Sequence, residues 1–446
     1  MKRIRLEVLT SAQTLLIGYL LFIILGASLL TLPVSVSGNE RLSFIDSLFT
    51  AASSISGSGL IVVDTGSYFS LFGQLVILFL IQTGNIGYMM IFALAVLVFG
   101  GKLSLVNKML IKNSISISNL DIRIFVFKVF KYTLIIEGIS ALLLFLHFIG
   151  EFHLSEAIYQ SVFHSISSFC TAGFSLFPDN LSAYSDNHYI VFVVILTSYL
   201  GSCGFFVLHD LSGYVKSFTK KKRLYKLSTH TKIAVSVSLI IIVSGTVFIW
   251  LAESILNPNH VDNTFLTAFF QSASASTTVG YNTINIGDMN NSSQLILIIE
   301  MFIGASPSGT GGGIKTTVFT IMVLALFSFI RDRKNVNTLH RSVHPTTIAK
   351  AFSISFLALM LVIFSVLVLS LTESADFLSI LFEVVSAFGG VGLSAGITQE
   401  LSSPGKFLLS IVMLVARTGP LLVGYSLIGK TKAINYQYPE ANILIV

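Results

Sequence analysis

The chain has 446 residues, of which 53% are hydrophobic and only 11% are charged, and its mean hydropathy is +0.84. This composition excludes a soluble globular protein and indicates one that crosses a membrane several times. The formal net charge is +6, and the two cysteines, Cys170 and Cys203, are too few for a disulfide framework or a metal site.

Long apolar runs follow one another along the chain, and most have the roughly 20 residues that a spanning helix needs. The first run is too long for the hydrophobic part of a signal peptide and has no small-residue cleavage site, so we predict a first spanning helix there. The runs cover residues 14–32, 70–99, 124–149, 189–208, 233–252, 294–304, 316–330, 351–371 and 407–429.

Most of the 27 Lys and Arg residues fall before the first run or in alternate connections between runs. The positive-inside rule places these segments in the cytoplasm, so we predict a multi-pass protein of the cell (plasma) membrane with both termini cytoplasmic. The opposite connections are acidic. An acidic outer mouth would concentrate cations, and an equally good interpretation is that these acids only satisfy the topology.

Four short segments share one spacing. In each, a Phe is followed four residues later by a Ser and ten residues later by a Gly, and the segments recur at 107 to 114 residues. A spacing this regular indicates an internal repeat. The sets are Phe49, Ser53 and Gly59; Phe163, Ser167 and Gly173; Phe270, Ser274 and Gly280; and Phe382, Ser386 and Gly392.

Each segment lies between two apolar runs and extends about 12 residues before its Gly, which as a helix reaches only about 18 Å. A half-membrane helix followed by irregular backbone must be buried in protein or line a water-filled cavity. Four such units can surround one axis, with their negative helix C-termini aimed at a cation. The predicted helix starts are Ser43 with Asp46, Ser155 with Glu156, Asp262, and Ser374 with Asp376.

The predicted fold is therefore an all-α polytopic membrane protein with four pseudo-repeated helix–pore-helix–helix units around a central ion pore. The units cover residues 10–100, 120–213, 230–332 and 345–430, and a cytoplasmic tail covers residues 431–446.

The third segment ends in Thr278-Val-Gly-Tyr281, the core of the potassium-channel filter sequence, in which backbone carbonyls replace the hydration shell of the ion. Gly tolerates the dihedrals that turn alternate carbonyls inward, whereas glycines serving only helix packing would not keep a fixed register to Phe. The predicted filter residues are Ser56, Gly57, Ser58, Gly59, Cys170, Thr171, Ala172, Gly173, Thr277, Thr278, Val279, Gly280, Gly389, Gly390, Val391 and Gly392.

The filter pattern departs from that of channels in two ways. Only the third copy has Thr-Val-Gly-Tyr, and Asn282 replaces the Gly that ends a channel filter. One Gly per repeat implies a shorter filter, so selectivity for potassium over sodium is less secure than in a four-fold identical filter.

The second span of the third repeat is interrupted. Pro307 and the glycines Gly309, Gly311, Gly312 and Gly313 cannot continue a helix. Irregular backbone at membrane depth must line a cavity, and beneath the filter it would obstruct the pore, so we predict a gate. The segment is a poor phosphate-binding loop, because Ile314 stands where that motif needs Gly and no β-strand precedes it.

Two basic residues lie within or beside the apolar runs. Lys315 either places a positive charge in the closed gate or extends to the cytoplasmic surface. Arg417 lies near mid-depth, where a charge usually marks an ion path; we favour a role in the gate over a structural pair with Glu300. Glu137 and His147 also lie in spans and are predicted to be structural.

Together these features resemble the Trk/Ktr/HKT superfamily of potassium transporters, and most closely the membrane subunit of bacterial Ktr systems. The resemblance covers nearly the whole chain. It rests on the four pore segments, Gly59-Leu-Ile-Val-Val-Asp64, Thr277-Thr-Val-Gly-Tyr281, residues 304–315 and Ala416-Arg-Thr-Gly-Pro420.

The resemblance implies potassium uptake by a non-enzyme without a covalent cofactor, with potassium and also sodium as candidate ions and with dependence on sodium. It implies a homodimer on a cytoplasmic ring of nucleotide-binding regulatory subunits, and a role for Arg417 near the interrupted span. The basic stretch from Lys216 to Lys232 is a candidate site for anionic lipid or for that subunit, and no nucleic-acid partner is expected.

A secondary transporter with alternating access is the leading alternative, since its broken helices bind substrate at mid-membrane. It accounts for the interrupted third repeat. It accounts poorly for the four matched outer segments, because none of them is an inverted copy.

Overall fold

The computed structural model describes residues 10–38, 41–99, 121–219, 226–256, 264–333 and 335–428. The predicted tail over residues 431–446, the basic residues 2–5 and 220–223, and the predicted helix start Asp262 lie outside these described residues. Regular structure is almost entirely helical, and one short hairpin pairs β1 (Asn337–Thr338) with β2 (Arg341–Ser342). The predicted all-α membrane fold is confirmed.

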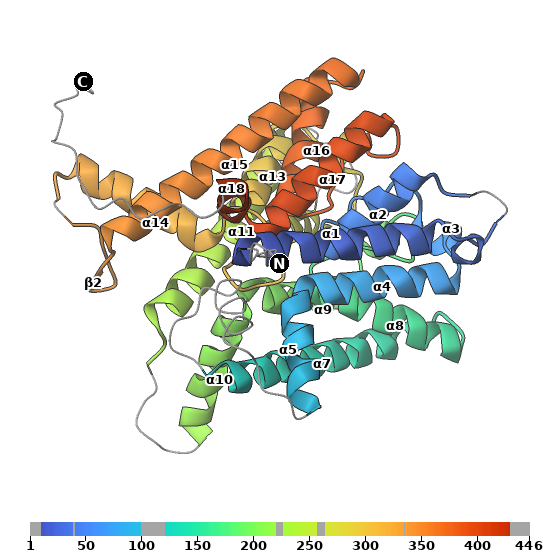
Figure 1. Ribbon diagram of the computed structural model, residues 1–446, viewed down its shortest axis with the longest axis horizontal. Helices are drawn as coiled ribbons and strands as arrows, with labels where there is room; N and C mark the ends of the chain where they lie inside the picture. Colours follow the sequence, from blue (N-terminus) through green and yellow to red (C-terminus); the bar gives the residue numbers. More distant parts are fainter. Residues whose placement is uncertain are drawn as a thin grey trace, which may run out of the picture.

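Four long helices each precede a shorter helix that ends inside the protein (Figure 1). All four long helices have the length and composition to cross a bilayer. They are α1 (Ser11–Leu30), α7 (Ile122–Phe148), α11 (Thr229–Leu256) and α15 (Pro345–Thr372). The shorter helices, called pore helices below, are α2 (Phe44–Ser56), α8 (Leu154–Phe169), α12 (Phe265–Thr277) and α16 (Phe377–Gly389).

The second span of each repeat consists of two helices. These pairs are α4 (Leu71–Ile86) with α5 (Tyr88–Val98), α9 (His188–Cys203) with α10 (Phe205–Thr219), α13 (Asn291–Ile303) with α14 (Thr316–Ile330), and α17 (Ser403–Thr418) with α18 (Pro420–Ile428). Short helices in the connections are η1 (Pro33–Ser35), α3 (Thr65–Tyr68), η2 (Ser182–Tyr184) and η3 (Ile286–Asp288).

All four second spans are therefore broken, whereas the sequence predicted a break only in the third. The apolar runs at 70–99, 189–208 and 407–429 were expected to be continuous, and that expectation is wrong. Single glycines, Gly87, Gly204 and Gly419, stand at the breaks with φ of 92°, 93° and 92°. Only Gly adopts such dihedrals without strain. Helices α5 and α10 leave α4 and α9 at 88° and 102°, and the bend between α4 and α5 is visible in Figure 1.

The pore helices begin at polar caps, with one exception. The Ser43 hydroxyl accepts a hydrogen bond from the Asp46 amide at 3.1 Å, as predicted. In the predicted pair Ser374 and Asp376, the cap is Asp376, and hydrogen bonds from the Ser379 hydroxyl and nearby amides lower the pKa of its carboxyl group. Helix α8 instead starts after His153, which makes no side-chain cap, so Ser155 is not the cap, whereas the predicted acid Glu156 does lie in the first turn.

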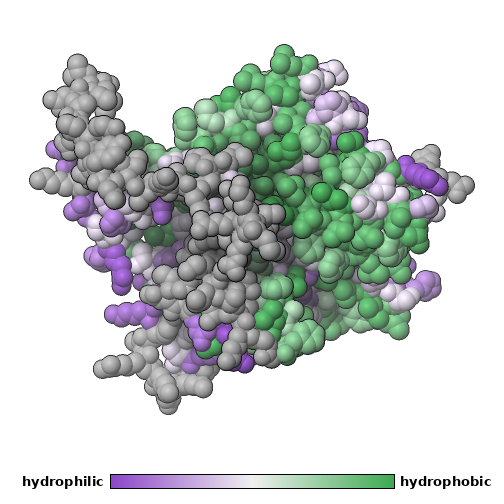
Figure 2. Space-filling model, viewed as in Figure 1, coloured by the Kyte–Doolittle hydropathy of each residue, from purple (hydrophilic) through white to green (hydrophobic). Residues whose placement is uncertain are grey.

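The periphery of the protein carries many exposed apolar side chains, whereas the pore helices are buried. Side chains such as Leu134 on α7 and Phe356 on α15 are 69% and 61% exposed. Figure 2 shows hydrophobic residues covering much of the visible face and hydrophilic residues near its left and right edges. The repeated Phe residues are at most 1% exposed and form part of the core around the pore helices. This is the surface of a multi-pass membrane protein.

Candidate functional site

The four predicted filter segments have one backbone pattern. Each leaves its pore helix through two residues of positive φ that stand two positions apart. This alternation is the one that a row of carbonyls facing the same side requires, and Gly is the residue that tolerates it best. The pairs are Gly57 and Gly59 (71° and 76°), Thr171 and Gly173 (50° and 67°), Thr278 and Gly280 (59° and 81°), and Gly390 and Gly392 (59° and 96°).

The repeated Ser explains how each pore helix ends. Its carbonyl accepts a hydrogen bond from the amide five residues later, at 2.9 to 3.1 Å, in all four copies. This is the bond of a Schellman motif, which closes a helix on a left-handed residue. The donor and acceptor pairs are Ser58 and Ser53, Ala172 and Ser167, Val279 and Ser274, and Val391 and Ser386.

The hydroxyl of the same Ser also links the pore helix to the filter segment that follows it. Ser167 donates to the Phe174 carbonyl at 2.8 Å, and Ser274 donates to the Tyr281 carbonyl at 2.6 Å. In the fourth copy the Ser386 hydroxyl accepts from the Gly392 amide at 3.0 Å. The Tyr281 hydroxyl donates to the Phe174 carbonyl at 3.0 Å, which links the third copy to the second.

The four glycines form a closed ring. A Cβ added to Gly59 would collide with the Ala172 carbonyl of the second repeat, and the same relation leads from each repeat to the next. The remaining pairs are Gly173 with the Val279 carbonyl, Gly280 with the Val391 carbonyl, and Gly392 with the Ser58 carbonyl. Because the fourth contact returns to the first repeat, the four filter segments surround a single axis.

The interrupted span of the third repeat folds as a loop between α13 and α14. Its backbone is anchored on the second repeat, because the Ser306 amide donates to the Ser202 carbonyl at 3.1 Å and the Thr310 amide to the Gly201 carbonyl at 3.2 Å. The Phe205 amide, just after the break at Gly204, donates to the Ser308 carbonyl at 3.2 Å. The loop is therefore an ordered structure.

The same loop touches three of the four filter segments. The Thr171 hydroxyl donates to the Thr310 hydroxyl at 3.1 Å, and Thr310 donates to the carbonyl of Phe169, the last residue of α8. A Cβ on Gly311 would strike the Thr278 hydroxyl, and one on Gly312 would strike the Gly389 carbonyl. The glycines allow the loop to lie directly against the ends of the pore helices.

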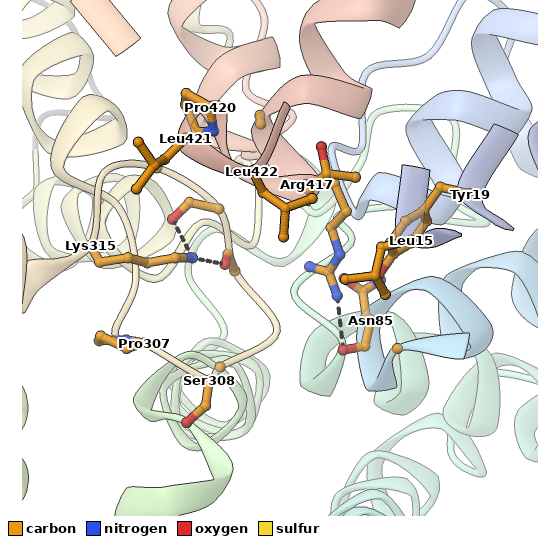
Figure 3. A pocket seen from close by; sticks show the side chains of 18 of the residues that line it. Leu15, Tyr19, Asn85, Pro307, Ser308, Lys315, Arg417, Pro420, Leu421 and Leu422 are labelled. Carbon is orange, nitrogen blue, oxygen red and sulfur yellow. Dashed lines mark hydrogen bonds between the residues drawn. The ribbon is translucent and has the colours of Figure 1, made fainter. Parts of the chain in front are cut away.

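Lys315 and Arg417 both donate to carbonyl groups (Figure 3). The Lys315 ammonium binds the carbonyls of its own loop at Gly311 and Gly312, at 2.5 and 3.1 Å, so it does not extend to the surface. The Arg417 guanidinium binds the Thr310 carbonyl and, on the first repeat, the Gly84 and Asn85 carbonyls at 2.6 and 2.9 Å.

The alternative prediction, that Arg417 pairs with Glu300, is wrong. The Glu300 carboxylate accepts from the Ser272 hydroxyl at 2.8 Å, behind the third pore helix. Glu137 accepts a hydrogen bond from Gln82 at 3.1 Å, and Gln82 in turn accepts one from the thiol of the filter residue Cys170 at 3.2 Å. The sequence could not identify Thr310, Gly84 or Asn85 as partners of Arg417, because a backbone carbonyl has no sequence signature.

A cavity of about 740 Å³ lies next to the loop and brings together all four breaks. Its lining includes Gly87, Phe205, loop residues 307–309 and 311–315, and Gly419, together with the basic side chains Lys315, Lys350 and Arg417. Loop residues that touch the filter also line this cavity, whereas no described residue of the four filter segments does. The loop thus lies between the filter and the cavity.

No group of three or more His, Cys, Asp or Glu side chains among the described residues could hold a metal ion. The ligands that the ring offers to an ion are backbone carbonyl oxygens, which suit a hard, weakly held cation rather than a transition metal. The fold and the ring therefore define a membrane protein with four pore segments around one ion path.

Comparison with known proteins agrees with this class. The family profile described as TrkH, cation transport protein, matches residues 19–426. The chain is 36% identical to the Ktr system potassium uptake protein B of Bacillus subtilis (strain 168), over 97% of this chain and 96% of the relative. It is 31% identical to the potassium/sodium uptake protein NtpJ of Enterococcus hirae, over 100% and 99%.

A solved structure has the same fold. The potassium transporter TrkH from Vibrio parahaemolyticus superposes with a TM-score of 0.73, at 18% identity, over 95% of this chain and 86% of that one. The chain belongs to the TrkH family of cation transport proteins, which are transporters and not enzymes.

Proposed function

We propose that this protein takes potassium ions into the cell through the ring of four filter segments. The closed ring of glycine and carbonyl contacts carries the proposal, because it gives four copies of one backbone pattern a common axis. A partly dehydrated ion on that axis is coordinated by carbonyls in place of water. All four copies enter the ring in the same register, which favours a pore over the inverted repeats of an alternating-access transporter.

The loop between Gly304 and Lys315 is the gate in this proposal. It lies against the filter on one side and the cavity on the other, so an ion leaving the filter meets it first. Arg417 holds the loop to the first repeat, and Lys315 holds its carbonyls together. The gate residues are Gly309, Gly311, Gly312, Gly313, Lys315 and Arg417.

The names of the relatives support proposals about the partners of this protein and about sodium. Two relatives are named as protein B of a Ktr system, in Bacillus subtilis and in Vibrio alginolyticus, which supports a separate regulatory subunit on the cytoplasmic side. The relative named a potassium/sodium uptake protein supports a role for sodium. We propose a homodimer with cytoplasmic termini, whose inner basic residues contact anionic lipid or the regulatory subunit.

Potassium uptake in cells that lack their own potassium transporters tests the function. Cells expressing this chain should take up potassium or rubidium, and comparison with and without sodium separates sodium dependence from transport itself. Failure to take up either ion, with the protein present in the membrane, would contradict the proposal.

Gly280→Ser tests the filter directly. Its φ of 81° and its contact with the Val391 carbonyl leave no room for a Cβ, and a strained residue of this kind costs about 1–3 kcal/mol, enough to lower potassium selectivity roughly tenfold. The matched control is Gly38→Ser, because a Cβ there has no neighbour within 4 Å. Unchanged selectivity of Gly280→Ser in ion competition would count against the filter assignment.

A further inference from the structure

The residue directly after the repeated Phe is polar in all four pore helices. These residues are Thr50, His164, Gln271 and Glu383, and each is at most 2% exposed. A buried polar side chain is costly unless it is hydrogen-bonded. The partners of these four residues therefore indicate why a polar group stands behind the filter.

In the fourth repeat, Glu383 binds the segment that follows the filter. Its carboxylate accepts hydrogen bonds from the Ser394 hydroxyl, from the Ala395 amide at 3.2 Å and from the Thr398 hydroxyl at 2.9 Å. Both carboxylate oxygens are used. One side chain thus connects the middle of α16 to the segment that follows Gly392.

The second and third repeats make the same connection with different chemistry. The Gln271 amide nitrogen donates to the Thr283 hydroxyl at 3.1 Å. In His164, Nδ1 faces the Gln160 carbonyl at 2.8 Å and so carries the proton, which leaves Nε2 to accept from the Ser175 hydroxyl at 3.2 Å and the Leu176 amide at 3.4 Å. In each case the partner lies 11 or 12 residues after the polar residue.

The first repeat lacks this connection within the described part of the chain. The Thr50 hydroxyl donates to the Asp46 carbonyl of its own helix at 2.8 Å. The hydroxyls of Ser53 and Ser58, on the same pore helix and filter segment, are buried without a hydrogen-bond partner. Among the described residues, this position therefore links three of the segments that follow the pore helices to those helices, and leaves the first one unlinked.

We propose that His164, Gln271 and Glu383 are positioning residues that set ion selectivity by holding the segments that follow the filter, while the first repeat remains the deformable side. A filter segment fixed at both the Ser and the polar position cannot move its carbonyls to suit a smaller ion. A filter segment without these links can. This inference rests on the proposed function, since it assigns selectivity to the same ring.

Three variants test it in potassium-transport-deficient cells, with rubidium uptake measured against sodium competition. Glu383→Met removes all three hydrogen bonds and should lower potassium-over-sodium selectivity about tenfold. Glu383→Gln retains an acceptor oxygen for Ser394 and Ala395 and should recover most of the loss. Thr50→Val, at the equivalent position of the first repeat, should leave selectivity unchanged.

The outcomes separate this inference from the proposed function. A wild-type protein without potassium selectivity contradicts the proposed function, whatever the variants do. If the wild type is selective and Glu383→Met has the same selectivity, the inference is overturned. It is also overturned if Thr50→Val loses as much selectivity as Glu383→Met. If Glu383→Met does not reach the membrane, Gln271→Met removes a single neutral hydrogen bond and gives the same test with a smaller expected loss.

Discussion

The second spans of repeats two and three break at corresponding places but in different ways. In repeat two, Gly204 alone turns the chain by 102° from α9 into α10. In repeat three, a loop from Gly304 to Lys315 separates α13 from α14. A single glycine is thus sufficient to redirect a span, so the additional residues of repeat three are not needed for the bend. The position of these additional residues between the filter and the cavity explains their presence better than the bend does.

Deleting residues 309–313 should make repeat three resemble repeat two and gives the largest expected effect. Without the loop segment that lies against Thr278 and Gly389, the path below the filter opens. Uptake should rise on the order of a hundredfold, the equivalent of losing two hydrogen bonds to charged groups. Initial rates of rubidium uptake, normalised to membrane abundance, measure this. A fall in uptake at equal abundance would show that the loop is more than an obstruction.

Arg417→Gln should have a smaller effect of the same sign. The guanidinium joins the loop at Thr310 to the first repeat at Gly84 and Asn85, and loss of one such hydrogen bond corresponds to roughly tenfold in rate. Arg417→Lys is the matched control, because it retains the charge but lacks the planar fork needed to reach all three carbonyls. If Lys and Gln raise uptake equally, hydrogen-bond geometry matters more than charge. If neither raises it, Arg417 does not hold the gate.

The smallest effect should distinguish two glycines of nearly equal φ. Gly204→Ala and Gly87→Ala both impose a strained backbone, at a cost of about 1–3 kcal/mol. A Cβ on Gly204 would also meet the Pro307 carbonyl at 2.5 Å, whereas a Cβ on Gly87 has no neighbour within 4 Å. Gly204→Ala should therefore lower the thermal unfolding midpoint of the purified protein further. Equal midpoints would mean that the loop moves away from the added Cβ without a measurable loss of stability.

The pore helices could be predicted from the sequence because their signal is repeated. The Phe, Ser and Gly register appears four times, and each member has a local role: Phe is buried, Ser closes the helix and Gly takes the positive φ. The interruption at Pro307 was equally visible, since Pro and several glycines together cannot continue a helix.

The breaks at Gly87, Gly204 and Gly419 could not be predicted in the same way. A lone Gly in an apolar run is also what close helix packing uses, and only the observed φ separates the two roles. The partner of Arg417 was missed for a related reason. An acidic residue such as Glu300 is an obvious candidate in a sequence, whereas the carbonyls of Gly84 and Asn85 are common to every residue type.

The ring of four glycines belongs to one polypeptide rather than to four identical subunits. In a symmetric tetramer, one codon change alters every side of the filter at once, and most such changes destroy it. Here a mutation at Gly59, Gly173, Gly280 or Gly392 alters a single quadrant. A substitution in one repeat can therefore leave the other three unaltered, and the four filter segments of this chain have four different sequences.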